Sequence, residues 1–181
     1  MRLAAPLLTA TLLAALCSTT AIAALKPGTT APGFTARASL GGKEFDFSLS
    51  EALKKGPVVL YFYPAAFTPG CTIEAREFAE ATDKFAALGA SVIGVSADDI
   101  DKLNEFSVSE CRSKFPVAAD AFKDIMAAYD AVLPGKPEYA NRTSYVIAPD
   151  GQIIYEYTAL DPSGHVENTL AAVAKWKAEQ K

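Results

Sequence analysis

The sequence predicts an α/β fold in which a central mixed sheet is flanked by helices. Three observations support this prediction: two continuous apolar segments typical of buried strands, amphipathic segments that alternate with them, and a later pair of strand-like segments around a tight turn. The chain has 181 residues, of which 50% are hydrophobic and 21% charged, as in ordinary globular domains. This length fits one domain with a full core.

The centre of the chain begins with a strand and a helix. Residues 58–63 are apolar or aromatic throughout and are followed by a proline, which predicts a central strand buried on both faces. Residues 72–88 place Ile73, Phe78 and Phe85 at roughly helical spacing among charged side chains. This spacing predicts an amphipathic helix with these three side chains on its apolar face.

A second strand and helix follow. Residues 91–96 form another short apolar segment that predicts a buried strand. Asp98 and Asp101 resemble an N-cap and a first-turn acid, and predict a helix that runs to about Ser113. The centre of the chain therefore alternates strand, helix, strand, helix.

The C-terminal part predicts a hairpin and a last helix. Residues 143–148 and 152–157 flank a Pro-Asp-Gly turn, which is a strong hairpin signal. Residues 163–181 are helical in pattern. An α/β unit followed by a hairpin and a terminal helix suits a thioredoxin-like sandwich.

The start of the chain predicts export. Residues 1–23 combine a positively charged start, an apolar stretch and small side chains before Ala24, which predicts a secretory signal peptide that is removed there. The apolar stretch is shorter than the roughly 20 residues of a spanning helix, although an uncleaved anchor and a lipoprotein signal at Cys17 are alternatives. We therefore expect residues 24–181 to form a single domain that is periplasmic or secreted, free of the membrane, where disulfides persist.

Charge and composition exclude several classes of function. Seventeen basic residues against 21 acidic ones give a net charge of −4, which offers no basis for binding nucleic acid. Three cysteines and one histidine leave no Cys/His cluster for zinc, so we expect no metal and no other cofactor. The histidine, His165, follows a Pro-Ser-Gly turn near a helix start, where a solvent-facing residue without a role is expected.

Cys71 is the strongest candidate for chemistry. It stands where a predicted strand has ended and a helix begins, so unpaired N–H groups and the positive end of the helix dipole would favour its thiolate. The thiolate is the nucleophilic form of cysteine. Position alone fits a buried structural cysteine equally well, because free cysteine packs as a small hydrophobic residue.

Two separated motifs resemble those of a known family. Pro64, Thr68 and Cys71 form the pattern Pro-x-x-x-Thr-x-x-Cys, which resembles the active-site signature of peroxiredoxins. The residues around this pattern are similar to the BCP/PrxQ branch, and Arg142, just before a predicted strand, resembles the second signature. The resemblance covers essentially the whole mature chain. It implies a monomeric peroxidase that reduces hydrogen peroxide and organic hydroperoxides with electrons from a thioredoxin-like or other thiol reductant.

The resemblance also implies roles for these residues. Cys71 would be the peroxidatic cysteine that becomes a sulfenic acid. Thr68 would supply a hydroxyl and Arg142 a fixed positive charge for the breaking O–O bond, while Pro64 would shield the thiolate. Singly, these residues fit a turn, a surface charge and a strand end; jointly with Cys71 they favour catalysis. Glu74 is left open, because the helix dipole alone explains an acid in a first turn.

The resolving step is less defined by the sequence. Many members of the branch carry a resolving cysteine five residues after the peroxidatic one, where this chain has Arg76. Cys111, on the next predicted helix, resembles the resolving cysteine of other members and implies an intramolecular Cys71–Cys111 disulfide. Bridging needs Cα atoms within about 7 Å, or local unwinding. A one-cysteine cycle with an external thiol, an exported thiol–disulfide oxidoreductase and a non-catalytic binding module of the same fold are the alternatives.

Overall fold

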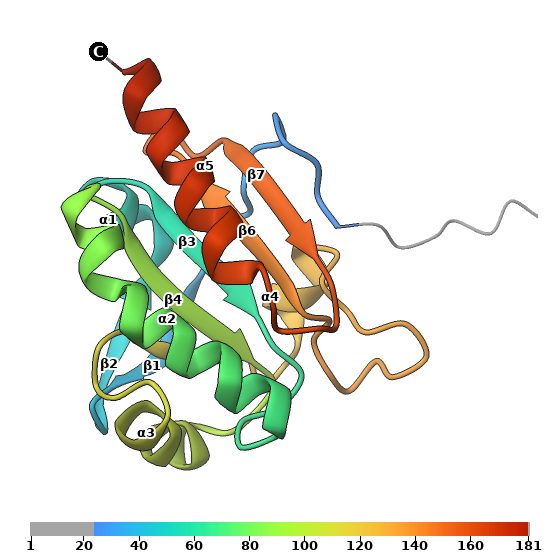
Figure 1. The fold of residues 1–181 in the computed structure, drawn as a ribbon. Coiled ribbons are helices and arrows are strands. Elements are labelled where there is room, and N and C mark those ends of the chain that lie inside the picture. Colours follow the sequence, from blue (N-terminus) through green and yellow to red (C-terminus); the bar gives the residue numbers. More distant parts are fainter. Residues whose placement is uncertain (1–23, 181) are drawn as a thin grey trace, which may run out of the picture.

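The computed structural model describes residues 24–180, so the signal peptide expected over residues 1–23 lies outside the described part (Figure 1). Within that part the chain forms seven strands and five helices. In order they are β1 (Thr35–Leu40), β2 (Lys43–Ser48), α1 (Leu49–Leu53), β3 (Val58–Phe62), α2 (Pro69–Ala87), β4 (Ser91–Ser96), α3 (Ile100–Ser109), β5 (Val117–Ala119), α4 (Asp124–Ala128), β6 (Thr143–Ile147), β7 (Ile153–Thr158) and α5 (His165–Glu179).

The seven strands form one mixed sheet in the order β2-β1-β5-β4-β3-β6-β7. β4 pairs in parallel with both β3 and β5, and the remaining pairs are antiparallel. β3 lies inside the sheet and is buried along its whole length. The predicted fold class, the buried central strand, the second strand and the C-terminal hairpin are therefore confirmed.

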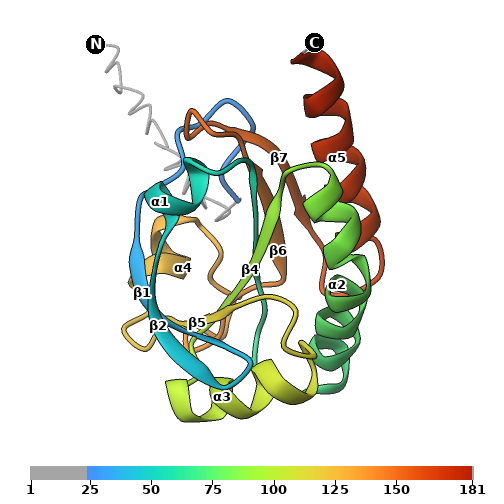
Figure 2. The same ribbon diagram turned by 90° about the vertical axis from the view of Figure 1, so that its left-hand side faces the viewer.

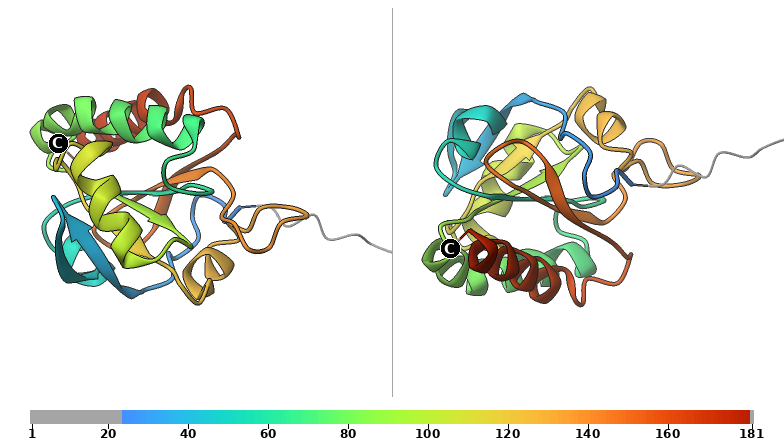
Figure 3. Two further views of the ribbon diagram at one scale, coloured as in Figure 1. Left: turned by 90° about the horizontal axis from the view of Figure 1, so that it is seen from below. Right: turned by 90° about the horizontal axis from the view of Figure 1, so that it is seen from above.

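Helices cover both faces of the sheet (Figures 1 and 2). Alternate residues of β3 point to opposite faces, so Val59 and Tyr61 join a cluster with residues of α2, α3 and α5. Leu60 and Phe62 join the second cluster, beside α1 and α4. Seen from below and above, α2 and α5 lie side by side on one face, and they contact each other directly (Figure 3). None of the helices within residues 24–180 has the length and apolar character needed to cross a bilayer.

The third helix differs from its prediction at both ends. Its N-cap is Asp99, whose side chain accepts a hydrogen bond from the Lys102 N–H, and not Asp98. Its last residue is Ser109, four residues before the predicted end. Arg112 and Ser113 have φ angles of 50° and 55°, a left-handed conformation that no α-helix contains. Cys111 therefore lies in the turn between α3 and β5.

The start of the second helix is also rotated relative to the prediction. Ile73, expected on the apolar face, is 49% exposed, whereas Glu74 is fully buried. Phe78 and Phe85 are buried as predicted. The reversal follows from a polar contact, because Glu74 points inward and accepts a hydrogen bond from Arg142.

Gly94 in β4 gives a test of the packing under α2. A Cβ atom at this position would lie 2.7 Å from the ring of Tyr61, which stacks on Phe78. We expect Gly94→Ala to lower the free energy of unfolding by about 1–3 kcal/mol, because the buried ring must move. Urea denaturation measures this loss. Gly33→Ala, where an added Cβ meets no atom within 4 Å, is the control; equal stability of both variants would contradict the account.

Candidate active site

Cys71 lies in the first turn of α2 and is 1% exposed. Thr68 is the N-cap of this helix and Pro69 its first residue, a position that suits proline because no N–H is needed there. The loop before the helix turns sharply at Phe67, whose φ is 66°. The cysteine sulfur is thus held at the positive end of a 19-residue helix.

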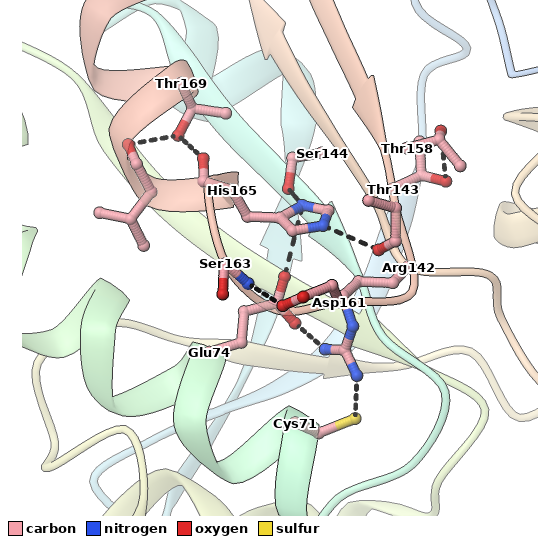
Figure 4. A network of polar contacts seen from close by, with 12 residues as sticks. Cys71, Glu74, Arg142, Thr143, Ser144, Thr158, Asp161, Ser163, His165 and Thr169 are labelled. Atoms are coloured by element: carbon pink, nitrogen blue, oxygen red, sulfur yellow. Dashed lines mark hydrogen bonds and ion pairs between the residues drawn. The ribbon is translucent and has the colours of Figure 1, made fainter.

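Arg142 meets this sulfur from the neighbouring strand. It directly precedes β6, which pairs with β3 so that Thr143 lies opposite Phe62, and this register brings Arg142 to the end of β3 where the Cys71 loop starts. The Arg142 Nη2 atom donates to the Cys71 Sγ at 3.4 Å (Figure 4). Its Nε donates to the Leu160 carbonyl at 2.9 Å, and the residue is only 4% exposed. The guanidinium is therefore held from more than one side.

Gly70 makes the approach of the guanidinium possible. A Cβ atom at this position would lie 2.9 Å from the Arg142 Nη2 atom, closer than real Cβ contacts allow. Because Arg142 is also bonded to Glu74 and to the Leu160 carbonyl, it has little freedom to retreat. A side chain immediately before Cys71 would therefore displace the guanidinium.

Glu74 lies three residues after Cys71, about one turn further along α2, and is fully buried. Its Oε2 atom accepts a hydrogen bond from Arg142 Nη1, while its Oε1 atom has no hydrogen-bond partner. Burial raises the pKa of this carboxyl to about 8, against the opposing effect of Arg142. The role that the sequence left open for Glu74 thus includes fixing the guanidinium.

The prediction that His165 faces solvent is wrong, because this residue is fully buried at the start of α5. Its Nδ1 atom lies 2.8 Å from the Ser144 Oγ and 3.5 Å from the Glu74 Oε1, and its Nε2 atom lies 3.0 Å from the Ala159 carbonyl oxygen (Figure 4). Burial lowers its pKa to about 4. Sequence spacing could have revealed this position, since His165 shares a helical face with the buried residues Thr169 and Val173.

The predicted loop residues Pro64 and Thr68 make no hydrogen bond to the Cys71 sulfur. Thr68 is exposed, and its hydroxyl donates to the Ala65 carbonyl at 2.9 Å. Pro64 is half-buried, two residues after the end of β3. Asp98, which the sequence suggested as a helix cap, instead accepts the Ala66 N–H at 2.7 Å and so fixes the loop that precedes Cys71.

Cys111 is fully buried, and both Cys71 and Cys111 are free thiols. The two side chains belong to the same apolar cluster beneath α2 and α3. Burial raises the pKa of the Cys111 thiol well above its ordinary value. Three ion pairs connect the turn that carries Cys111 to the outer face of α2; they are Glu110 with Arg76, Arg112 with Glu80, and Lys114 with Asp83.

The arrangement suits nucleophilic attack by sulfur on a small polar molecule. The Arg142 guanidinium and the positive end of α2 meet at one buried sulfur, where they can stabilise negative charge as it moves to the molecule under attack. Within residues 24–180, no group of three or more histidine, cysteine or acidic side chains is placed to hold a metal ion.

Comparison with known proteins agrees with this geometry. The AhpC/TSA family model matches residues 27–156, well over half of the chain. A putative peroxiredoxin of Mycobacterium tuberculosis is 36% identical over 128 residues, which are 69% of this chain and 82% of that protein. Chloroplastic peroxiredoxin Q of Oryza sativa subsp. japonica is 36% identical over 157 residues, or 79% of this chain and 64% of the rice protein.

Solved structures agree as well. The crystal structure of peroxidoxin BcpB from Mycobacterium tuberculosis matches with a TM-score of 0.75 and 32% identity, over 83% of this chain and 97% of the other. This likeness confirms the thioredoxin-like fold predicted from the sequence. The chain therefore belongs to the AhpC/TSA family, as a peroxiredoxin and thiol peroxidase of the Bcp/PrxQ type.

Proposed function

We propose that Cys71 is the peroxidatic cysteine of this enzyme. Its thiolate sulfur attacks the terminal oxygen of a hydroperoxide, so that an S–O bond forms while the O–O bond breaks. The sulfur is oxidised to a sulfenic acid, and the leaving oxygen takes up a proton and departs as water or an alcohol. The observation that carries this proposal is the 3.4 Å contact between the Arg142 guanidinium and the Cys71 sulfur in a buried site.

Arg142 stabilises the negative charge that develops on the peroxide oxygens, which the thiolate alone cannot do. A thiol that ionises easily is a weaker nucleophile, so a rapid reaction needs stabilisation of the charge that passes to the peroxide oxygens. The planar guanidinium has five N–H donors and a permanent positive charge for this task. The Thr68 hydroxyl donates to the Ala65 carbonyl, and from the N-cap of the same helix it can rotate to donate to the peroxide. Pro64 limits the access of water to the thiolate.

The substitution Cys71→Ser tests the reaction itself. We expect peroxide consumption with dithiothreitol to fall to the uncatalysed rate, because serine cannot form a sulfenic acid. Cys111→Ser is the matched control and should keep the first oxidation of Cys71. Equal peroxide consumption by wild type and Cys71→Ser would contradict the proposal and leave a binding module or a thiol–disulfide oxidoreductase.

The substitution Gly70→Ala tests the placement of Arg142 without removing any reacting group. We expect kcat/KM for peroxide to fall by roughly 10- to 100-fold, because the added methyl group displaces the guanidinium from the sulfur. Thermal unfolding should show that the fold persists. Unchanged kcat/KM in a correctly folded Gly70→Ala variant would show that the contact is not needed.

We propose further that Cys111 resolves the sulfenic acid. The Cys111 sulfur attacks the Cys71 sulfur, a disulfide forms, and the sulfenic oxygen leaves as water. Both side chains lie in one apolar cluster, but Cys111 is fully buried, so its turn must open first. Two features of the turn favour opening: the left-handed conformations of Arg112 and Ser113, and the exposure of two of its three ion pairs, which are therefore weak.

A count of thiols after oxidation tests the resolving step. We expect one equivalent of peroxide to leave no free thiol in the mature wild-type protein under denaturing conditions, and one intramolecular disulfide by mass spectrometry. Cys111→Ser should instead hold Cys71 as a sulfenic acid that a dimedone probe captures. One remaining thiol and a trapped sulfenic acid in the wild type would instead indicate a one-cysteine cycle with an external reductant.

Export is the third part of the proposal. Residues 1–23 have the pattern of a signal peptide, so we propose a periplasmic or secreted monomer that receives electrons from an exported thiol protein with a thioredoxin-like fold. We expect the mass of the protein purified from its native compartment to correspond to a chain that starts at Ala24. A mass that includes residues 1–23, or a lipid on Cys17, would contradict this prediction.

A further inference from the structure

We propose that Glu74 and His165 form a buried pair in which, at neutral pH, the Glu74 carboxyl is protonated and the His165 ring is neutral. Because the protonated carboxyl has no charge, the positive charge of Arg142 stays free to act on Cys71. His165 is then a positioning residue that acts through Glu74. The effect on peroxide reduction rests on the function proposed above, whereas the location of the proton does not.

The hydrogen bonds of His165 define its tautomer. A carbonyl oxygen only accepts hydrogen bonds, so the contact of 3.0 Å with the Ala159 oxygen requires a proton on Nε2. In the neutral ring, Nδ1 then has a lone pair and accepts the Ser144 hydroxyl at 2.8 Å. The nitrogen that faces Glu74 is thus an acceptor.

The carboxyl of Glu74 is matched to this acceptor only when it carries a proton. Its Oε1 atom is buried, has no hydrogen-bond partner and lies 3.5 Å from the His165 Nδ1. An ionised oxygen would face this lone pair with no donor and remain unpaired at a high cost, whereas a protonated oxygen removes the repulsion and shares the Nδ1 acceptor with the Ser144 hydroxyl. The Oε2 atom stays available as the acceptor for Arg142.

Together, the burial of Glu74 and His165 and the charged groups around them favour a proton on Glu74. Burial raises the pKa of Glu74 to about 8 and lowers that of His165 to about 4, so both groups favour their neutral forms. From α2, Glu77 also raises the pKa of Glu74. From the loop before α5, Asp161 raises the pKa of His165, against the effect of Arg142. The remaining ring neighbour is Tyr157 of β7, whose ring centroid lies 4.8 Å from that of His165.

The protonation state of Glu74 determines how much charge Arg142 offers to the sulfur. With a neutral carboxyl, the guanidinium keeps its full positive charge beside Cys71. As the pH rises through about 8, the carboxyl ionises and pairs with the guanidinium, so the field at the sulfur weakens. Peroxide reduction should therefore decline on the alkaline side with a midpoint near pH 8.

Nitrogen NMR can locate the proton directly, because His165 is the sole histidine of the chain. The sample is the mature protein without a histidine tag, labelled with 15N in the imidazole ring. We expect a neutral Nε2–H ring from pH 5.5 to 9, with an Nδ1 shift that changes around pH 8 as the Glu74 proton is lost. A protonated ring at pH 7, or an Nδ1 shift that stays constant from pH 6 to 9, would overturn the proposal.

Variants connect the proton to activity. Glu74→Gln should abolish the change in the Nδ1 shift and flatten the alkaline decline of kcat/KM, whatever its absolute rate. Glu105→Gln, which removes an exposed acid from α3, is the control and should keep both. If Glu74→Gln keeps the wild-type midpoint, the proposal fails. A wild type without peroxidase activity would refute the function proposed for Cys71, and the NMR result would still decide where the proton lies.

Two substitutions at His165 separate positioning from packing. His165→Phe keeps a ring but offers no acceptor, so we expect the alkaline midpoint to fall by about half a unit to one unit, the worth of one hydrogen bond. His165→Gln retains an acceptor and should shift the midpoint less. If both folded variants had the same alkaline midpoint as the wild type, His165 would only contribute to packing and the proposed positioning role would be wrong.

Discussion

The candidate active site depends on one contact, between the guanidinium of Arg142 and the sulfur of Cys71. The two residues are 71 positions apart, and the sheet brings them together because β6 pairs antiparallel with β3 and so begins where β3 ends and the Cys71 loop starts. The start of α2 presents the sulfur from the other side. Strand pairing, helix start and loop therefore serve a single geometry, and the absence of a side chain at Gly70 permits it.

The buried positive charge of Arg142 needs polar or negatively charged partners, and the site provides few of them. Arg142 has the Cys71 sulfur, the Glu74 carboxyl and the Leu160 carbonyl as partners. A permanently ionised Glu74 would compete with the sulfur for this charge. A carboxyl that is held neutral by burial orients the guanidinium while leaving its charge to the reaction, and His165 gives the proton of that carboxyl an acceptor.

Much of this could be predicted from the sequence, for physical reasons. Long apolar segments predict β3, β4 and the hairpin, and the spacing of Pro64, Thr68 and Cys71 points to the start of α2 as the candidate site. Strands and helices as short as β5, α1 and α4 carry too few residues for periodicity to show. The sequence does not predict the burial of Glu74 and His165, because polar residues normally face solvent. The inward position of Glu74 depends on Arg142, which precedes a strand that is distant in sequence. The premature end of α3 depends on the left-handed turn at Arg112 and Ser113, for which the sequence has no glycine signal.

The most direct test of the central contact is the rate at which one equivalent of peroxide oxidises Cys71 in the variant Arg142→Gln, measured by rapid quench and mass spectrometry. The account predicts a rate about 100- to 1,000-fold below that of the wild type, because the variant lacks the charge that stabilises the transition state. A rate within a few-fold of the wild type, in a folded variant, would contradict it.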